Sequence, residues 1–358
     1  MACSAPLAHR ELEAAVTVSV VVPTYRRSRY LDYSLASFLC QRHGDFEIVI
    51  VNDGGDEDAR RVVQKYERDL DITYLWREHR GRAAARNTGV ETAQGDVVVF
   101  CDDCLMADPA LIRQHLAAVR AAEDVAVVGW KRRALTVWER GRLPTVESDF
   151  LSLLDRAPAL AARLPHDDFP LLDPEQVATD YAESLSLIDL GDDVINYADI
   201  LDRYSATLDQ FRFPWMLATT GNMSVRRQQV LDSGGFSEDY TGWGMEDTDL
   251  GYRLHRDGVR FVVDQEARGF HQLHPVGDGA LGQDLRVRRG QLVKNFRVFY
   301  EKYDNDPAVR LLWLAWADAV DIFQANQILL EIEAGTRQGL PEDLQYQGPP
   351  QIAPDRLV

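Results

Sequence analysis

Short apolar segments alternate with segments of helical spacing through the first third of the chain. The apolar segments are Val16–Val22, Phe46–Val51, Ile72–Leu75 and Val97–Phe100. The segments with apolar residues at helical spacing are Tyr30–Cys40, Asp58–Asp69 and Ala83–Thr92. Short strands that alternate with helices predict an α/β fold with a mostly parallel, doubly wound sheet. Because ligands bind such sheets at the carboxyl ends of the strands, we expect the functional residues there.

The second half of the chain has a different pattern. From about Trp138 to Phe213 it is acidic and leucine-rich, with several prolines and no strand pattern, which predicts an inserted helical segment. Alternating strand patterns return at Met216–Val225 and at Arg260–Val263. After Gly290 we expect helices, and beyond Gly339 a Pro-rich, loosely ordered tail.

Composition and charge narrow the class of protein. The 358 residues are 46% hydrophobic, enough for two domains or for one large domain with attachments. No apolar run is long enough to span a membrane and the N-terminus lacks a signal-peptide pattern, so we expect a cytoplasmic protein. The net charge of −18 argues against nucleic-acid binding. Residues 145–210 hold 15 acidic and 3 basic residues, so the rest is only mildly acidic and has room for a local phosphate site.

Carboxylates follow two of the predicted strands. Asp53 lies in the turn sequence NDGG, where it is either a turn residue or an acceptor for a ligand N–H such as N3–H of uracil. Asp102 and Asp103 directly follow the strand that ends near Phe100. Adjacent carboxylates repel each other and are costly to desolvate unless a cation compensates. They therefore either cap the next helix or hold a metal ion.

Cations gather in the stretch WREHRGRAAARNTGV, residues 76–90, which holds five arginines or histidines. They form either a solvated helix face or a diphosphate site at a helix N-terminus, and the second reading is favoured in an acidic protein. Nearby, Cys101 and Cys104 form a C-x-x-C pair, but there is no second cysteine pair at zinc spacing. A zinc or redox site of that type is therefore disfavoured.

Two motifs in the second half carry further candidate chemistry. In TGWGMEDTDLGYR, residues 241–253, Trp243 lies between two glycines and precedes three acids at the start of a predicted helix. Acidic residues cap helices, but a glycine-flanked tryptophan beside them suits the stacking of a sugar ring, with one carboxylate as general base. In GFHQLHP, His271 and His274 are either metal ligands or ordinary polar loop residues.

Together these motifs resemble the GT-A-fold, inverting glycosyltransferases of family 2. The resemblance is strongest to the branch with a galactosyltransferase-like GWG-x-ED block, found in bacterial chondroitin polymerases and animal β-1,4-galactosyltransferases. The motifs that carry it are VSVVVPTYRRSRYLDYSLASFL, VIVNDGG, GRAAARNTGV and GGFSEDYTGWGMEDTDLGYRLHRDG, within Val16–Leu135 and Phe213–Arg289. It implies a nucleotide-sugar-binding half at 16–135, an acidic helical insertion at 136–212, an acceptor-side half at 213–289, and a helical C-terminal extension with a tail at 290–358.

The resemblance also implies an activity and a set of site residues. The activity is transfer of a sugar from a nucleotide diphosphate donor, expected to be UDP-linked, to an acceptor hydroxyl with inversion and with Mn²⁺ or Mg²⁺ as cofactor. Residues implied at the donor are Pro23, Thr24, Tyr25, Arg27, Asp53, Arg80, Arg86, Asp102 and Asp103. Residues implied at the metal are Asp102, Asp103 and His271, and residues implied at the acceptor are Asn222, Trp243 and Gly244. Asp247 is the expected base, with Glu246 as its rival.

One position departs from the family pattern. The third D-x-D position, which usually binds the metal, is Cys104, and Mn²⁺ and Mg²⁺ prefer oxygen to sulfur. A catalytically silent sugar-nucleotide or glycan-binding protein is therefore the alternative, although the acids at 246 and 247 argue against it. A nucleotidyltransferase is disfavoured because PTYRR stands where a glycine-rich loop is expected. The acceptor (a small molecule, a peptide or a glycan) and self-association remain open.

Overall fold

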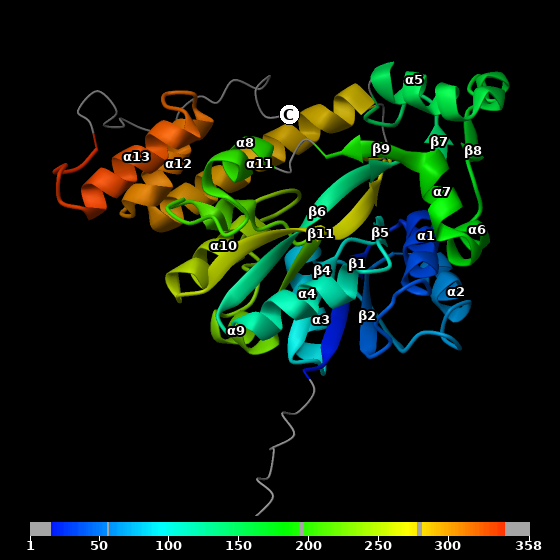
Figure 1. Ribbon diagram of the computed structural model, residues 1–358, viewed down its shortest axis with the longest axis horizontal. Helices are drawn as coiled ribbons and strands as arrows, with labels where there is room; N and C mark the ends of the chain where they lie inside the picture. The colour runs from blue at the N-terminus through cyan, green and yellow to red at the C-terminus, as the bar shows by residue number, and fades with distance from the viewer. Residues whose placement is uncertain (1–15, 56, 146, 194–196, 278–280, 341–358) are drawn as a thin grey trace, which may run out of the picture.

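The computed structural model describes residues 16–55, 57–145, 147–193, 197–277 and 281–340 (Figure 1). In this part of the chain a nine-stranded sheet has the order β3-β2-β1-β4-β10-β6-β11-β5, with β9 paired to β6. Its strands are β1 Val18–Thr24, β2 Phe46–Asp53, β3 Ile72–Arg77, β4 Val97–Cys101, β5 Leu105–Ala107, β6 Val125–Ala134, β9 Asp189–Asp192, β10 Asn222–Arg226 and β11 Arg260–Gln272.

The first four strands are parallel, as the alternating pattern predicts. Side chains alternate between the two faces of the sheet, because successive residues of a strand point to opposite sides. Val20 and Val22 belong to the hydrophobic cluster on one face, and Val21 belongs to the cluster on the other. Buried on both faces, these strands need the continuous β-branched runs that the sequence has.

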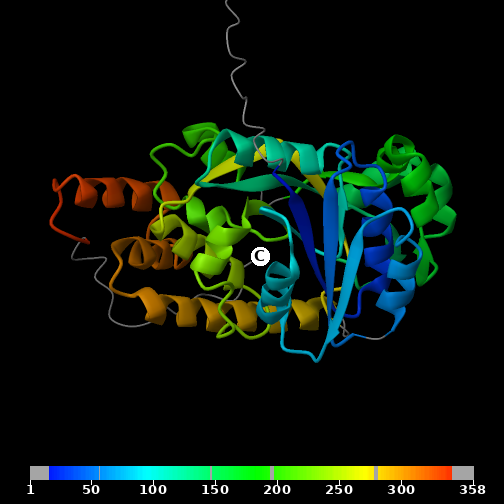
Figure 2. The ribbon, with the colours of Figure 1, turned by 90° about the horizontal axis from the view of Figure 1, so that it is seen from below.

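Helices cover both faces of this sheet (Figure 2). One face packs against α1 Ser28–Phe38, α2 Asp58–Gln64, α4 Leu111–Ala121, α6 Pro174–Thr179 and α7 Tyr181–Ile188. The hydrophobic cluster on the other face includes residues of α3 Arg82–Thr92, α8 Ala198–Tyr204, α9 Arg227–Asp232, α10 Glu246–Arg256, α11 Leu281–Tyr303, α12 Pro307–Trp316 and α13 Ile322–Glu333. The α/β fold class with flanking helices is confirmed.

The second half of the sheet mixes directions. β10 is antiparallel to both β4 and β6, whereas β11 is parallel to β6. The carboxyl ends of β1, β2, β4 and β11 therefore meet at one edge, together with the amino end of β10. At that edge His271 of β11 lies opposite Leu105 of β5, and the Gln272 N–H donates to the Cys104 carbonyl oxygen at 2.9 Å.

Two expected strand boundaries in this half were wrong. The strand expected at Met216–Val225 begins only at Asn222, because the 3₁₀ turn Pro214–Leu217 comes first. The strand expected at Arg260–Val263 continues to Gln272 through an irregularity between Asp264 and Arg268. The second half of this strand is rich in polar residues, so the sequence pattern does not predict it. It is a strand because β6 pairs with it on one side and β5 on the other.

The expected all-helical insertion contains strands as well. Alongside α5 Glu147–Arg156 and the 3₁₀ turn Pro158–Ala162, β8 Asp168–Pro170 pairs with β7 Val137–Glu139, and β9 pairs with β6. The sequences DFP and DLGD have low strand propensity, so their pairing partners determine these strands. The insertion also binds α1, where the Tyr30 hydroxyl donates to Glu139 Oε1 at 2.7 Å.

The C-terminal helices begin earlier than expected. α11 starts at Leu281, not after Gly290, so its first turns lie within the part expected to belong to the acceptor side. The apolar segment Leu311–Leu330 is divided between α12 and α13. In the described part of the chain, none of the helices has the length and apolar character needed to cross a membrane. The tail expected beyond Gly339 lies mostly outside the described residues.

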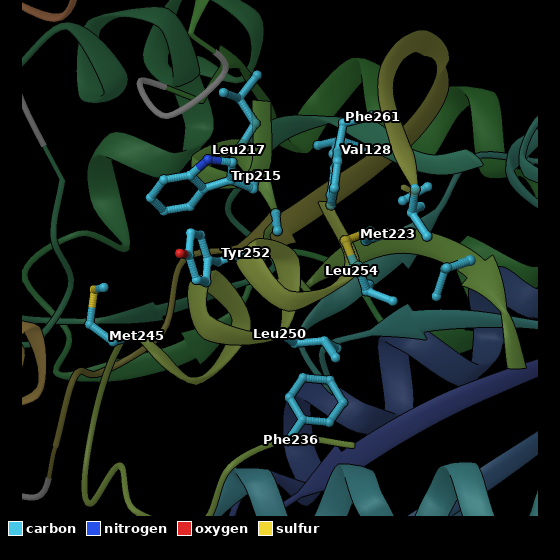
Figure 3. Packing of buried hydrophobic residues seen from close by; sticks show 14 of the residues in the cluster. Val128, Trp215, Leu217, Met223, Phe236, Met245, Leu250, Tyr252, Leu254 and Phe261 are labelled. Carbon is cyan, nitrogen blue, oxygen red and sulfur yellow. The ribbon is translucent and has the colours of Figure 1, made fainter. Parts of the chain in front are cut away.

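The core beneath α10 fixes the start of that helix (Figure 3). Leu250 and Leu254 are fully buried on its inner face, and Tyr252 packs edge-on against Trp215 with ring centroids 5.0 Å apart. Gly251 permits this close packing, since a Cβ there would lie 2.5 Å from the Ala218 side chain. The acids at the helix start are thereby held against the edge where the strands end.

Candidate active site

The two aspartates after β4 lie in different environments. Asp103 is buried, and its carboxylate accepts hydrogen bonds from Thr24 Oγ1 at 2.8 Å and from the Arg27 guanidinium at 3.2 Å. Asp102 has a side chain 35% exposed and is paired with Arg86 at 3.2 Å. Burial alone would raise the pKa of Asp102, but Arg86 and Lys131 hold it below its usual range. Asp102 is therefore a partly exposed, ionised carboxylate, while Asp103 connects β4 to the loop after β1.

The end of β2 forms a small aromatic site. Asp53 accepts backbone N–H groups of Arg80 and Gly81 at 3.1 and 2.7 Å, so the loop after β3 wraps around its carboxylate. His79 also contacts this carboxylate, at 2.9 Å. The His79 ring stacks on Tyr25, which is 37% exposed, with centroids 4.4 Å apart. This arrangement offers an aromatic face beside a carboxylate.

The glycine-flanked loop before α10 takes an unusual backbone path. Gly242, Gly244 and Met245 all have positive φ, and for Met245 this conformation is strained. A Cβ at Gly242 would meet the Gln291 side chain at 2.6 Å, so the loop needs glycine to pack against α11. Trp243 is half-buried there, with the Arg288 guanidinium 4.8 Å from its ring centroid.

The three acids at the start of α10 differ in their partners. Buried Glu246 is bound to Arg86 at 2.9 Å. Asp249 is fully buried and accepts hydrogen bonds from Tyr240 and Arg253, and also from Lys302 and Tyr303 of α11, which link α10 to that helix. Within the described part of the chain, the hydrogen bond of the half-buried Asp247 carboxylate is a local one, from its neighbour Thr248 N–H at 2.9 Å. In this part of the chain Asp247 is therefore the one of the three acids without an ion pair.

Burial also tunes the Asp247 carboxyl. Burial and the neighbouring Glu246 raise the pKa of Asp247 to about 6, against the opposing effect of the Arg86 charge. A carboxyl with a pKa near neutrality is better matched to accepting a proton than an ordinary aspartate. The geometry and the pKa thus assign the same residue as the candidate base.

Three arginines from separate elements converge beside Asp102. Arg27 follows β1, Arg82 begins α3, and Arg288 lies on α11. Burial, together with the positive charges of Arg82 and Arg27, lowers the pKa of Arg288 to about 10. Guanidinium groups that repel one another mark a site suited to an anion, and a diphosphate would relieve the repulsion.

The donor atoms grouped around Cys104 are not those expected for Mn²⁺ or Mg²⁺. Among the described residues, ligand atoms of Cys104, His271 and His274 lie within 4.8 Å of one another. Asp103 is engaged by Thr24 and Arg27. One sulfur and two nitrogens do not fit a Mg²⁺ or Mn²⁺ ion held by oxygen ligands.

The other expected residues occupy varied places. Arg80 points to Glu238 in an exposed ion pair, and Arg86 is enclosed by two carboxylates. Asn222 is fully buried, and its amide bonds His115 and the backbone of the neighbouring strands. An acceptor would have to break these bonds to reach it. Pro23 lies within β1 and Gly244 in the loop that carries Trp243.

Sequence reasoning missed two cations of the site. Arg288 lies in the basic run RVRR. In an acidic chain such a run could have indicated an anion-binding residue. Lys131 of β6 is 8% exposed and acts on the pKa values of Asp102, Asp247 and His271. A Cβ at Gly221 would lie 2.6 Å from Asp102 Oδ2 and 3.4 Å from Lys131 Nζ, so this glycine leaves room for both.

Comparisons with known proteins bear on the family and the fold of the chain. Residues 19–171 match the family described as glycosyl transferase family 2, and residues 202–274 match the N-terminal domain of galactosyltransferase. An uncharacterized glycosyltransferase of Bacillus subtilis, YfnE, is 29% identical over 292 residues, which are 80% of this chain and 70% of that one. Validoxylamine A glucosyltransferase of Streptomyces hygroscopicus subsp. jinggangensis is 30% identical over 72% of this chain and 56% of its own.

Two further comparisons extend the match. Chondroitin synthase of Escherichia coli is 27% identical over 80% of this chain, which spans only 39% of that protein. A mannosyltransferase of Pyrobaculum calidifontis, solved with GDP-Man and Mn²⁺, superposes with a TM-score of 0.54 at 17% identity over 90% of this chain and 76% of that one. At that identity the superposition speaks for the fold alone. The chain is a glycosyltransferase of the family 2 type with a GT-A fold.

Proposed function

We propose that this chain transfers a sugar from a UDP-linked donor to an acceptor hydroxyl with inversion at the anomeric carbon. The observation that carries the proposal is the difference in partners on α10, where in the described structure Asp247 alone of the three acids has no ion pair. A binding protein has no need of a carboxyl tuned toward neutrality. The catalytically silent alternative rests on Cys104, which stands where the family has an acid.

The donor would lie across the strand ends. Its base would stack near Tyr25 and His79, with Asp53 accepting an imide N–H such as that of uracil. Asp53 also contacts His79 Nδ1 at 2.9 Å and Arg77 Nε at 3.4 Å, so a base N–H would share this carboxylate with His79 or replace it there. The diphosphate would lie among Arg27, Arg82 and Arg288.

The chemical step would proceed by direct displacement. Asp247 takes the proton of the acceptor hydroxyl as its oxygen attacks the anomeric carbon, and the bond from that carbon to the diphosphate oxygen breaks. Attack opposite the leaving group inverts the configuration. The arginines stabilise the charge that develops on the departing diphosphate, which is worth most in a partly desolvated site.

A panel of nucleotide sugars tests this proposal without knowledge of the acceptor. We expect slow hydrolysis of one or more UDP-sugars and little turnover of GDP-sugars. The released sugar is measured by chromatography. Each donor is assayed with Mn²⁺, with Mg²⁺ and in chelator, beside Asp247→Asn as the control. Tight nucleotide binding without turnover of any donor would favour the silent binding protein.

Replacing Arg288 by glutamine should weaken diphosphate stabilisation. Removing one donor from a site of developing negative charge lowers kcat by about 10²–10³-fold. We expect kcat for donor hydrolysis to fall in that range, with a smaller loss of UDP affinity by calorimetry. The matched control is Arg297→Gln, farther along the same helix α11. Equal activity of the two variants would remove Arg288 from the donor site.

A further inference from the structure

Cys104 and two histidines meet at the edge of the sheet although they are distant in the sequence. Cys104 lies in the turn between β4 and β5, and His271 and His274 lie at the end of β11 and just beyond it. The antiparallel pairing of β11 with β5 places His271 opposite Leu105, and a backbone hydrogen bond joins Gln272 to Cys104. Their three ligand atoms lie within 4.8 Å of one another, which a single bound ion can bridge.

The histidine partners leave nitrogen lone pairs for that ion. His274 Nδ1 lies 2.7 Å from the Pro275 carbonyl oxygen, an acceptor, so Nδ1 carries the proton and Nε2 keeps its lone pair. His271 Nδ1 lies 4.0 Å from Asp193 Oδ2. The carbonyl partner of His274 is of the kind that commonly orients metal-binding histidines, whereas the 4.0 Å separation at His271 is too long for a hydrogen bond.

The chemistry of these donors selects a class of ion. One thiolate and two imidazoles suit Zn²⁺ or Co²⁺, whereas Mg²⁺ and Mn²⁺ prefer oxygen. Cys104 and His274 are buried and the His271 side chain is 31% exposed, so solvent reaches this group from the side of His271. Cys101 is outside this group, which therefore differs from a C-x-x-C site.

We propose that Cys104, His271 and His274 bind a thiophilic divalent cation such as Zn²⁺, in place of an oxygen-ligated Mn²⁺ or Mg²⁺. The positive charge of the ion would be offset by the Cys104 thiolate and by the nearby Asp102 carboxylate. The inference concerns metal binding alone and does not rest on the proposed transfer reaction.

Cobalt binding to the full chain gives a direct readout. After removal of metals by chelator, titration with Co²⁺ should give one equivalent of binding, a thiolate-to-cobalt charge-transfer band in the near ultraviolet, and the strong visible bands of a four-coordinate site. Zn²⁺ should displace the cobalt and abolish both signals. Mn²⁺ at equal concentration should displace neither the bound Co²⁺ nor the bound Zn²⁺.

Variants identify the ligands. Cys104→Ser should abolish the charge-transfer band and weaken Zn²⁺ binding by more than about 100-fold, since even changes outside the ligand shell weaken metal binding by about 10–100-fold. Cys104→Asp should also lose the band and shift the preference of the site toward Mn²⁺. Cys40→Ser and Cys3→Ser are the control variants and should keep the parental spectrum. Melting curves establish that each variant is folded.

Two results would overturn the inference. One is a parental spectrum without the charge-transfer band, or with a band that persists in Cys104→Ser. The other is displacement of Co²⁺ by Mn²⁺ as readily as by Zn²⁺. Because none of these readouts requires sugar transfer, an inactive protein with an intact cobalt spectrum would contradict the proposed function and leave the metal site standing.

Discussion

Replacing Asp247 by asparagine should lower the rate of sugar transfer by about 10²–10⁴-fold, the usual contribution of a positioned general base. Asparagine keeps the shape of the side chain and its acceptor oxygen for Thr248 N–H, but it cannot take a proton. Donor affinity should stay nearly unchanged, because the expected donor contacts lie at the strand ends and not on α10. Single-turnover transfer rates and calorimetry with UDP measure the two effects separately.

The matched control is Asp239→Asn, which makes the same change at an exposed carboxylate in the loop before Trp243. It should transfer sugar at the parental rate. Glu246→Gln separates the rival acid from the base, because Glu246 is buried and bound to Arg86. If Glu246→Gln stops transfer while Asp247→Asn does not, the base is Glu246. If neither variant slows transfer, this motif only shapes the acceptor site.

The pH dependence of transfer gives an independent check on Asp247. Burial and the adjacent Glu246 raise the pKa of Asp247 to about 6, and the base works only when ionised. The rate constant kcat/KM should therefore be level above that pH and fall about tenfold per pH unit below it. The Asp247→Asn variant should lack this limb of the profile. A parental rate that stays level down to pH 4 would contradict the assignment.

The alternating pattern of the first hundred residues predicts most of what is found there. Val20, Val21 and Val22 are all buried, and such runs form strands covered on both faces. Because the strands are parallel, the acids that follow them meet at one edge, which is why Asp53 and Asp102 were recognisable as candidates. The strands and the acids that follow them depend on neighbouring residues in the chain, so the local sequence pattern predicts them.

The features that were missed depend on partners far along the chain. β9 has the sequence DLGD, which forms a strand only because β6 offers it a pairing edge. Arg288 lies on a helix that the pattern placed later, and only the folded chain brings it above Trp243. The three acids at the start of α10 have different partners, which their adjacent positions in the sequence could not predict. Arg86 binds Glu246 and Tyr303 binds Asp249, and both partners lie far from α10 in the sequence.

Replacing Arg86 by methionine should lower the free energy of unfolding by about 3–5 kcal/mol, as is usual when one partner of a buried ion pair is removed. The Arg86 side chain is only 4% exposed and binds Glu246, itself 6% exposed, at 2.9 Å. Without Arg86, the Glu246 carboxylate would be left buried and unpaired. Urea denaturation followed by circular dichroism measures the loss. Arg80→Met is the control, because its ion pair with Glu238 is exposed and should contribute no more than about 1 kcal/mol.

The double variant Arg86→Met/Glu246→Gln tests the cause of this loss. Removing the orphaned charge should restore much of the stability, whereas a loss due only to altered packing would persist. Arg86 also links stability to catalysis, because its positive charge lowers the pKa of Asp247. In Arg86→Met that pKa should rise further, so the fall in kcat/KM should begin at a higher pH than in the parent. An unshifted profile would show that Arg86 does not act on the base, and would limit its role to pairing Glu246 and Asp102.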